Sequence, residues 1–230
     1  MKNKIIIFGT GEIGRLAHFY FTNDSNYEVV AFCCDEEFKT QDTFLNLPLL
    51  SMEEASIKFP SKLYGMHVAL SYSKLNKIRE EKYLLAKSLD YNLVSYISSK
   101  SVTWPDLEIG ENCFILENQT IQPYVKIGNN VMIWSGNHLG HGCKIGDHSY
   151  LSSHICISGN TIIGKRCFIG VNSHFKDFIK IGDDVIIAMG ASVSKDVADN
   201  HCVAGHRSEV FKPDDKLTLL IRKNYFKINE

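Results

Sequence analysis

Large apolar side chains recur at every sixth position through the second half of the chain. Fifteen hexads follow one another in a single phase: Ile109, Ile115, Ile121, Ile127, Ile133, Leu139, Ile145, Leu151, Ile157, Ile163, Ile169, Phe175, Ile181, Ile187 and Val193. Since 44% of the residues are hydrophobic, chance would produce such a run about five times in a million. A small or β-branched residue often stands four places on, as at Cys113, Val131, Cys143, Thr161, Cys167, Val185 and Ala191. This period predicts a parallel β-helix of about five coils, with three hexads in each coil and the apolar side chains stacked inside.

The first half of the chain alternates between patterns typical of strands and of helices. Strands are expected at Lys4–Phe8, Val29–Cys34, His67–Leu70 and Leu93–Ile97, and helices at Leu16–Phe21 and Lys74–Leu89. Ser51-Met52-Glu53-Glu54 has the spacing of a capping box, so a further helix is expected to begin there and to end before Pro60. The sequence therefore predicts an α/β domain of the half-Rossmann type at residues 1–97. A β-helix is expected at 98–208, and a tail at 209–230 with a short helix over Asp214–Phe226.

The composition and charge of the chain disfavour some classes of binding partner. The net charge is −1 and the isoelectric point is near 6.7, which argues against nucleic acid or a membrane surface bound through a basic face. No signal-peptide pattern and no apolar run of membrane-spanning length are found, so we expect a cytoplasmic protein without membrane insertion. The seven cysteines form no Cys-x-x-Cys pair, and Cys113, Cys143 and Cys167 fall at small inward positions of their hexads, where core packing is expected.

A glycine-rich turn follows the first expected strand. Gly9-Thr10-Gly11-Glu12-Ile13-Gly14 matches the Gly-x-Gly-x-x-Gly phosphate-binding fingerprint, and Asp35 follows about twenty residues later. Glycines at these places let the backbone approach a diphosphate, whose charge the amides at a helix N-terminus can hold. A tight turn without a ligand is the alternative. About 97 residues is half of a dinucleotide-binding fold, so a mononucleotide or a sugar linked to a nucleoside diphosphate suits this domain better than NAD.

A half-Rossmann domain joined to hexapeptide coils resembles the bacterial acyltransferases that modify nucleotide-linked sugars, such as the enzymes of the bacillosamine and perosamine pathways and the sialic acid O-acetyltransferases. The resemblance covers Lys4 to about Ser208 and is most specific in three segments: Leu139–Asp147, Ser158-Gly159-Asn160 and Ala188-Met189-Gly190-Ala191. It implies a left-handed β-helix, a homotrimer, and transfer of an acetyl group from acetyl-CoA to the amino group of a nucleotide-linked deoxyamino sugar for surface glycans such as lipopolysaccharide O-antigen. No metal is implied.

The most specific segment contains the expected catalytic residue, His141. It stands two places after the inward Leu139, so its side chain is expected to point out of the prism, and Gly159 follows eighteen residues later, one coil above. We expect His141 to accept the proton of the nucleophile and the N–H of Gly159 to stabilise the thioester oxyanion. The resembling enzymes commonly have Asp or Glu directly after this histidine, whereas this chain has Gly142. His138, Asn137, Asp147 or a residue of the next subunit could orient the ring, or His141 could act unaided.

The resemblance also indicates the binding residues. Acetyl-CoA contacts are expected at Gly159, Gly170, Gly190, Ala191 and Arg207, although Arg207 could equally be a solvated cation. Contacts to the nucleotide-linked sugar are expected at Gly9, Gly11, Glu12, Ile13, Gly14, Asp35, Trp134 and His138. Trp134 could form a wall against the sugar ring or pack at a trimer contact.

Other functions remain open from the sequence. A sugar O-acetyltransferase of the same fold and a non-catalytic trimer that binds a nucleotide-linked sugar fit the same features. A β-helix carbonic anhydrase is disfavoured because the hexads from Ile109 to Val193 contain no His-x-x-x-x-His pair, and an NAD-dependent oxidoreductase because no second catalytic domain follows the fingerprint.

Overall fold

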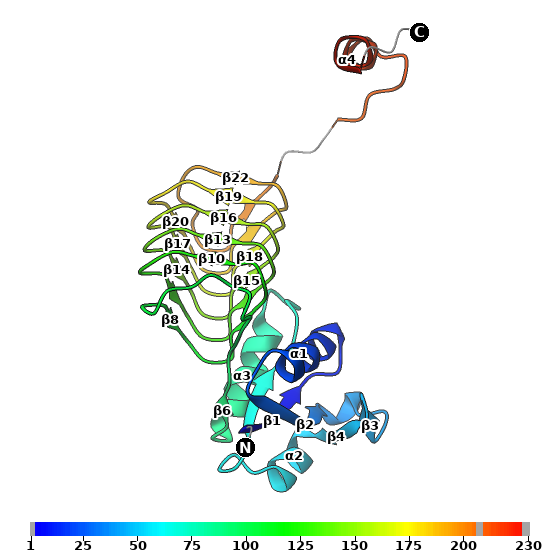
Figure 1. Cartoon of the computed structure of the whole chain (residues 1–230), viewed down its shortest axis with the longest axis vertical. Helices are drawn as coiled ribbons and strands as arrows, with labels where there is room; N and C mark the ends of the chain where they lie inside the picture. Colours follow the sequence, from blue (N-terminus) through cyan, green and yellow to red (C-terminus); the bar gives the residue numbers. More distant parts are fainter. Residues whose placement is uncertain (1–2, 206–208, 227–230) are drawn as a thin grey trace.

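The computed structural model describes residues 3–205 and 209–226, and it joins an N-terminal α/β part to a stack of β-coils (Figure 1). The N-terminal sheet has the strand order β3-β4-β2-β1-β5-β6, in which β3 is the antiparallel edge strand. Its strands are β1 Asn3–Phe8, β2 Tyr27–Cys34, β3 Thr43–Phe44, β4 Leu47–Ser51, β5 Gly65–Val68 and β6 Asn92–Leu93. The helices are α1 Glu12–Asn23, α2 Met52–Lys58 and α3 Lys77–Ser88, with a single 3-10 turn at Glu36–Phe38.

Alternation along the strands divides the N-terminal core into two layers. Ile5 and Ile7 face α1, while Ile6 and Phe8 face α2 and α3 on the opposite side of the sheet. The layer that contains α1 continues into the coils, so α1 lies between the sheet and the β-helix. The capping box is present as expected, because the Ser51 hydroxyl accepts from the Glu54 N–H and the Glu54 carboxylate accepts from the Ser51 N–H.

Several element boundaries differ from the expectation. Helix α1 begins at Glu12, inside the fingerprint, and α3 begins only at Lys77 because the preceding residues 74–76 have positive φ angles. The strand expected at Leu93–Ile97 is two short strands in different sheets, because β6 pairs with β5 and the next strand, β7, pairs with a strand of the coils. The chain therefore passes from one part to the other at residues 94–95.

The coils form a three-sided prism, which confirms the expected parallel β-helix (Figure 1). Face A contains β7 Tyr96–Ile97, β9 Phe114–Ile115, β12 Met132–Ile133, β15 Tyr150–Leu151, β18 Phe168–Ile169, β21 Ile186–Ile187 and β23 Cys202–Val203. Face B contains β10 Thr120–Ile121, β13 His138–Leu139, β16 Cys156–Ile157, β19 His174–Phe175 and β22 Ser192–Val193. Face C contains β8 Glu108–Ile109, β11 Lys126–Ile127, β14 Lys144–Ile145, β17 Ile162–Ile163 and β20 Lys180–Ile181.

The sequence period agrees with the pairing between coils. Strands of adjacent coils pair in parallel at an offset of eighteen residues, as Leu139 does with Ile157, and the second residue of each strand points inward. Cys113, Cys143 and Cys167 are buried in this core, as expected. The stack extends beyond the detected period at both ends, from β7 to β23. In the last coil Ile187 pairs with Val203, sixteen residues on, so the six-residue phase is lost there.

The edges of the prism require an unusual backbone conformation. One residue in every hexad from 112 to 190 has a positive φ angle, and asparagine and glycine are frequent there because they adopt this conformation at the lowest cost. Gly142 is one of them, with φ of 69°. Tyr124 and Phe178 hold the same conformation with exposed aromatic side chains on the edge between faces B and C.

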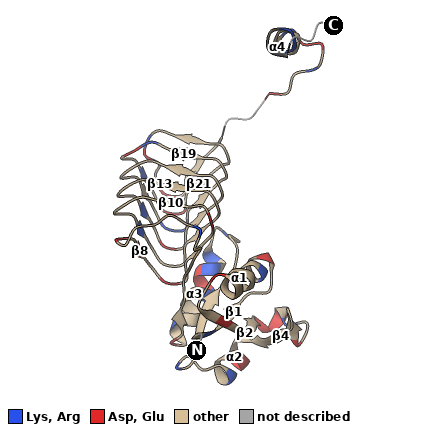
Figure 2. Cartoon of the chain, in the orientation of Figure 1, with Lys and Arg blue, Asp and Glu red and all other residues tan. Residues whose placement is uncertain are grey.

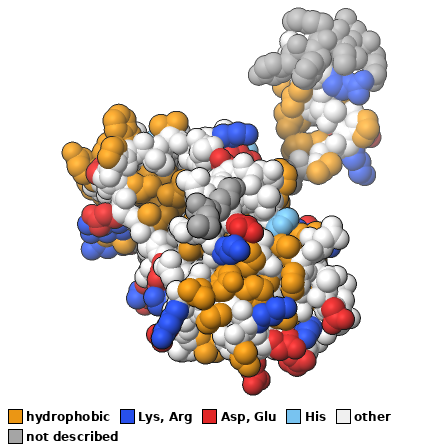
Figure 3. Space-filling model, turned by 60° about the horizontal axis from the view of Figure 1, so that its bottom comes forward, with side chains coloured by type: hydrophobic (Ala, Val, Ile, Leu, Met, Phe, Trp, Pro, Cys, Tyr) orange, Lys and Arg blue, Asp and Glu red, His pale blue; other side chains and the backbone are white. Residues whose placement is uncertain are grey.

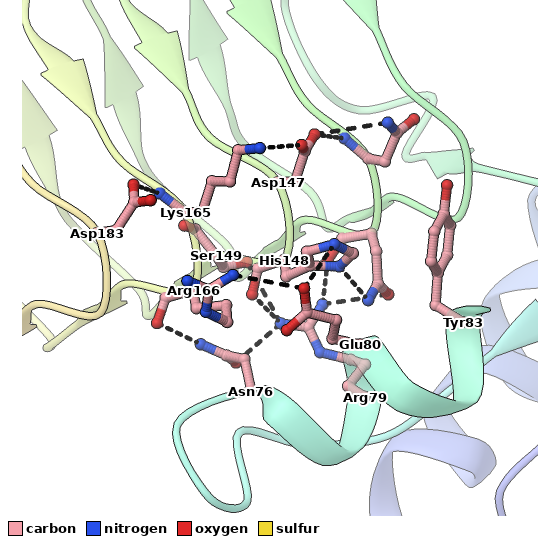
Figure 4. Close-up of polar contacts among 12 residues, drawn as sticks. Asn76, Arg79, Glu80, Tyr83, Asp147, His148, Ser149, Lys165, Arg166 and Asp183 are labelled. Carbon is pink, nitrogen blue, oxygen red and sulfur yellow. Dashed lines mark hydrogen bonds and ion pairs between the residues drawn. The ribbon is translucent and has the colours of Figure 1, made fainter. Parts of the chain in front are cut away.

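A buried polar cluster fixes the N-terminal part against the coils (Figure 4). Arg79 of α3 is 2% exposed and donates to the backbone carbonyls of Asn130 and His148 and to the side chain of Asn76. Burial lowers the pKa of Arg79 to about 10, which leaves it charged at neutral pH. Glu80, next on the helix, lies 3.4 Å from the His148 ring nitrogen Nε2. These contacts join α3 to successive coils, so the sheet has a defined position relative to the prism.

Helix α4, Lys216–Phe226, follows the prism and stands apart from it (Figures 1 and 3). Leu217, Leu220 and Ile221 are each more than a third exposed. Within the described residues no helix is long and apolar enough to cross a membrane.

We expect the protein to lose stability on mild acidification because of a buried histidine, His67 on β5. Its ring is 1% exposed, its Nδ1 lies 2.9 Å from the Val94 carbonyl, and burial lowers its pKa from 6.5 to about 4. The unfolded chain then binds the extra proton, so stability is full above about pH 6.5 and falls as the pH drops, by about 2 kcal/mol at pH 5. Burial also lowers the pKa of His148, which acts in the same direction.

Urea unfolding at pH 7 and pH 5 measures this loss. The matched variant is His67→Phe, which keeps an aromatic ring beside Phe21 and Phe114 but cannot titrate. The variant should show a smaller acid loss than the parent, whereas equal losses in the two proteins would contradict the assignment to His67.

Candidate functional site

His141 and Gly159 lie in contact on the edge between faces B and C, which we call edge BC. His141 belongs to the turn between β13 and β14, and Gly159 occupies the equivalent place one coil above. The imidazole covers Gly159, since a Cβ built on that glycine would lie 2.5 Å from the His141 Cε1 atom. A side chain at position 159 would therefore displace the ring.

The backbone N–H of Gly159 is available to a ligand. Among the described residues it donates no hydrogen bond, although the equivalent N–H of His141 donates to the Oε1 atom of Gln122 at 2.8 Å. Gly140 keeps the approach open, because a Cβ there would lie 2.7 Å from the Gly159 nitrogen. A free N–H beside an exposed imidazole is an arrangement that can bind a developing oxyanion next to a base.

Gln122 is a residue that the sequence analysis missed. It lies one coil below His141, and its Oε1 atom is 3.3 Å from the His141 Nδ1 atom as well as 2.8 Å from the backbone nitrogen of His141.

Two of the residues expected to orient His141 form hydrogen bonds with other groups instead. The Asn137 side chain bonds within the core to Trp134 and Ile155, and Asp147 accepts from the Asn129 N–H on another edge.

The fingerprint has the geometry of a phosphate-binding turn. Gly9 has φ of 121°, and a Cβ on Gly14 would lie 2.2 Å from the Gly9 carbonyl oxygen, so both positions require glycine. Gly11 caps α1 without a side-chain bond, and a Cβ there would meet nothing within 4 Å, so its backbone is open to a ligand. The side chain of Ile13 is buried in the core and that of Glu12 is exposed. Ile13 can therefore contribute its backbone amide, but not its side chain, to a diphosphate site.

The strand order places a topological switch point at this turn, where open parallel sheets form a ligand crevice. Strand β1 has β2 on one side and β5 on the other, and the loops after β1 and β5 leave the sheet at the same edge. In open parallel sheets, ligands bind at such a switch point. Tyr72, in the loop after β5, is half exposed and contacts Tyr150 and Phe168 of face A, with ring centroids 4.9 and 4.8 Å away. The crevice therefore opens beside face A.

Two expected sugar-binding residues have partners in their own chain. Asp35 forms an ion pair with Lys82 of α3 at 2.9 Å, a contact that the sequence analysis missed. Trp134 is partly buried against face A and its indole N–H donates to the Tyr150 hydroxyl, so it packs within its own chain. His138 is half-buried on face B, in register with Thr120 and Cys156 of the neighbouring coils.

The structure divides the expected acetyl-CoA contacts between two edges. Gly159 lies on edge BC, whereas Gly170, Gly190 and Ala191 lie in turns that follow strands of face A, on the edge between faces A and B. Face B separates the two groups within one chain. Arg207 lies outside the described residues.

Face C, which borders the edge of His141, is basic at its surface (Figure 2). Lys126, Lys144 and Lys180 stand at the outward positions of β11, β14 and β20, and Lys126 is paired with Glu108 at 2.7 Å. In the described part of the chain, no group of three histidine, cysteine or acidic side chains could hold a metal ion.

Comparison with known proteins identifies the coiled part. Residues 124–154 and 160–195 match the family model of the bacterial transferase hexapeptide, six repeats. The prism carries bacterial transferase hexapeptide repeats. The hexapeptide part is 35% identical over 96 residues to the UDP-3-O-acylglucosamine N-acyltransferase of Bordetella avium, a match that covers 40% of this chain and 25% of the relative. The chain thus spans about a quarter of that relative's length.

Solved structures share the fold of both parts. The acetyltransferase domain of PglB from Neisseria gonorrhoeae superposes with a TM-score of 0.78 at 22% identity, covering 88% of this chain and 97% of the domain. PerB from Caulobacter crescentus, in complex with CoA and GDP-perosamine, superposes with a TM-score of 0.77 at 22% identity, covering 86% and 92% of the two chains. The hexapeptide prism and the N-terminal α/β region therefore occur together, in one fold, in both of these solved structures.

Proposed function

We propose that this protein transfers an acyl group, in the simplest case acetyl, from acyl-CoA to the amino group of a nucleotide-linked deoxyamino sugar. The observation that carries the proposal is the exposed His141 ring placed against the free N–H of Gly159. His141 accepts the proton of the attacking amine, and Gly159 stabilises the negative charge that develops on the thioester oxygen. The bond from the amine nitrogen to the acyl carbon forms, the thioester bond breaks, and the proton leaves with the CoA thiolate.

The nucleotide is proposed to bind at the N-terminal crevice. The amides from Gly11 to Gly14 would hold the diphosphate at the start of α1, and Asp35 would contact the ribose or base through the oxygen that Lys82 leaves free. Residues 1–97 would form the nucleotide-binding domain, 98–208 the acyltransferase domain and 209–230 the tail. We place the reaction in the cytoplasm, where nucleotide-linked sugars and acyl-CoA are made.

A homotrimer of left-handed prisms is part of the proposal. The nucleotide crevice opens beside face A, and edge BC is the edge that does not border face A. A sugar held by one chain therefore lies on the opposite side of the prism from that chain's own His141. A neighbouring chain can supply the missing His141, and the Gly170 and Gly190 edge of one chain can then meet the Gly159 edge of another across the CoA groove.

An acyl-transfer assay tests the function. Purified protein is mixed with acetyl-CoA and a panel of UDP-, GDP- and dTDP-linked amino and deoxy sugars, and CoA release is followed with a thiol reagent. We expect turnover only with amino sugars, giving an amide product that resists mild alkali. An alkali-labile ester product would indicate the O-acetyltransferase instead. Binding of a nucleotide-linked sugar without turnover of any of them would indicate the non-catalytic function.

Substituting Gly11 should weaken binding of the nucleotide-linked sugar without weakening binding of acetyl-CoA. Because the space around Gly11 is open, Gly11→Trp would place its side chain where the diphosphate approaches without a clash in its own chain. We expect the KM for the nucleotide-linked sugar to rise at least about tenfold while the KM for acetyl-CoA stays within about twofold. The control is Lys62→Trp, at an exposed position at the opposite end of the sheet, which should change neither KM. Gly65→Trp is unsuitable as a control because neighbouring atoms leave no space for a side chain at that glycine. If only the KM for acetyl-CoA rises, the two sites are reversed.

A further inference from the structure

The Gln122 amide has a single orientation that satisfies its neighbours. The backbone N–H of His141 can only donate, so the atom of Gln122 that lies 2.8 Å away must be the carbonyl oxygen Oε1. The same oxygen lies 3.3 Å from the His141 Nδ1 atom, and an amide oxygen can only accept. Nδ1 must therefore carry the proton in this contact, which leaves the lone pair of the imidazole on Nε2.

We propose that Gln122 is the positioning residue of the base, holding His141 in the Nδ1–H tautomer so that Nε2 is free to accept the proton of the nucleophile. This inference rests on the proposed role of His141. Gln122 is half-buried and contacts both the backbone and the ring of His141, so it fixes the position of the turn as well as the angle of the imidazole. It takes the place that a carboxylate often has beside a catalytic histidine, and Gly142 supplies no side chain for that purpose.

The neutral amide has a chemical consequence. A carboxylate orients the imidazole and also stabilises the imidazolium, whereas an amide oxygen does mainly the first. Gln122→Glu should therefore stabilise the protonated form of the His141 ring. The other titratable groups on the turns and strands that flank His141 remain in place in this variant: Tyr124, Lys126, His138, Cys143, Lys144 and Cys156. A difference in the pH profile between the parent and this variant can then be attributed to the exchange of the amide for a carboxylate.

Kinetics of three variants test the proposal. Gln122→Met removes the acceptor and keeps the size of the side chain, and we expect kcat to fall about 10- to 100-fold while the KM for acetyl-CoA stays within about twofold. Gln122→Glu should keep most of kcat at its own optimum and move the acid limb of the kcat/KM profile upward by about one pH unit. Lys165→Ala, exposed on the edge between faces C and A, is the control and should change neither kcat nor the acid limb. Parent-like kcat in Gln122→Met, or an unmoved acid limb in Gln122→Glu, would overturn the proposal.

A second measurement does not require activity. In protein labelled with nitrogen-15 at histidine, the His141 signals are assigned by their loss in His141→Ala. In the neutral form of the parent, Nδ1 should be the protonated nitrogen, and Gln122→Met should shift the tautomer towards Nε2–H. If the assay fails but the tautomer behaves in this way, the proposed reaction is wrong and the positioning contact stands. If the parent already has Nε2–H, the positioning role is wrong whatever the reaction.

Discussion

Replacing His141 with alanine is expected to lower kcat by about 10²- to 10⁴-fold while leaving the affinity for acetyl-CoA nearly unchanged. The expectation follows from the position of the ring, which is exposed on edge BC, lies against Gly159 and has Nε2 free. An alanine removes the proton acceptor but leaves the Gly159 N–H in place, so oxyanion stabilisation and substrate binding should account for the remaining rate. Steady-state kinetics and acetyl-CoA titration by calorimetry measure the two quantities.

Two further variants identify the lost group as a base. His141→Gln is polar and of comparable length, but it cannot accept a proton at neutral pH, so its rate should fall as far as that of His141→Ala. His201→Ala removes another exposed imidazole of the coils, one whose Nδ1 lies 2.9 Å from the Asp199 carbonyl, and should keep the parent rate. Near-parental kcat in a folded His141→Ala protein would remove His141 from the mechanism.

The prism could be predicted from the sequence because each coil repeats the same local requirement. An inward position must be apolar in every hexad, so residues such as Leu139 and Ile157 mark the fold without any knowledge of distant contacts. The ends could not be predicted in the same way. The last coil is two residues shorter than the others, and the apolar segment Leu93–Ile97 contributes to both β6 and β7, which pair in different sheets.

In the N-terminal part, some elements could not be predicted from the local pattern of side chains. Strand β4 was not expected because Pro48 interrupts its apolar run, yet this strand pairs with both β2 and β3. The side chains of residues 74–76 fit a helical pattern, but these residues have positive φ angles, and the Asn76 side chain donates to the carbonyls of Arg166 and Cys167 in the coils.

The contact between His141 and Gly159 could be predicted from the sequence, whereas the contacts of several other candidate residues could not. The eighteen-residue offset places His141 beside Gly159, because adjacent coils stack directly. The same offset would have placed Gln122 below Gly140, so a signal for this contact existed once the coil length was known. The contacts of Trp134 with Tyr150 and of Asp35 with Lys82 had no such signal. They depend on how face A and α3 pack against the rest of the chain.

The proposed homotrimer leads to the second large expected effect, which concerns sites shared between chains. His141→Ala and Gly11→Trp proteins should each be nearly inactive at low concentrations of nucleotide-linked sugar, for different reasons. If each site combines His141 of one chain with the nucleotide crevice of its neighbour, a hybrid trimer contains interfaces at which both surfaces are intact. Trimers that contain both chains should recover about one third of the parent activity, since one of their three interfaces joins an intact His141 to an intact nucleotide crevice, whichever chain is present twice.

Co-expression of the two variants with different affinity tags, followed by purification through both tags, yields hybrids in which subunit exchange is certain. Acetyl transfer to the nucleotide-linked amino sugar is then measured in the hybrids and in each variant alone. Recovery of activity well above both variants is the result that a site shared between neighbouring chains predicts. Hybrids that contain both chains and show no more activity than the variants alone would place the whole site within one chain and contradict the account.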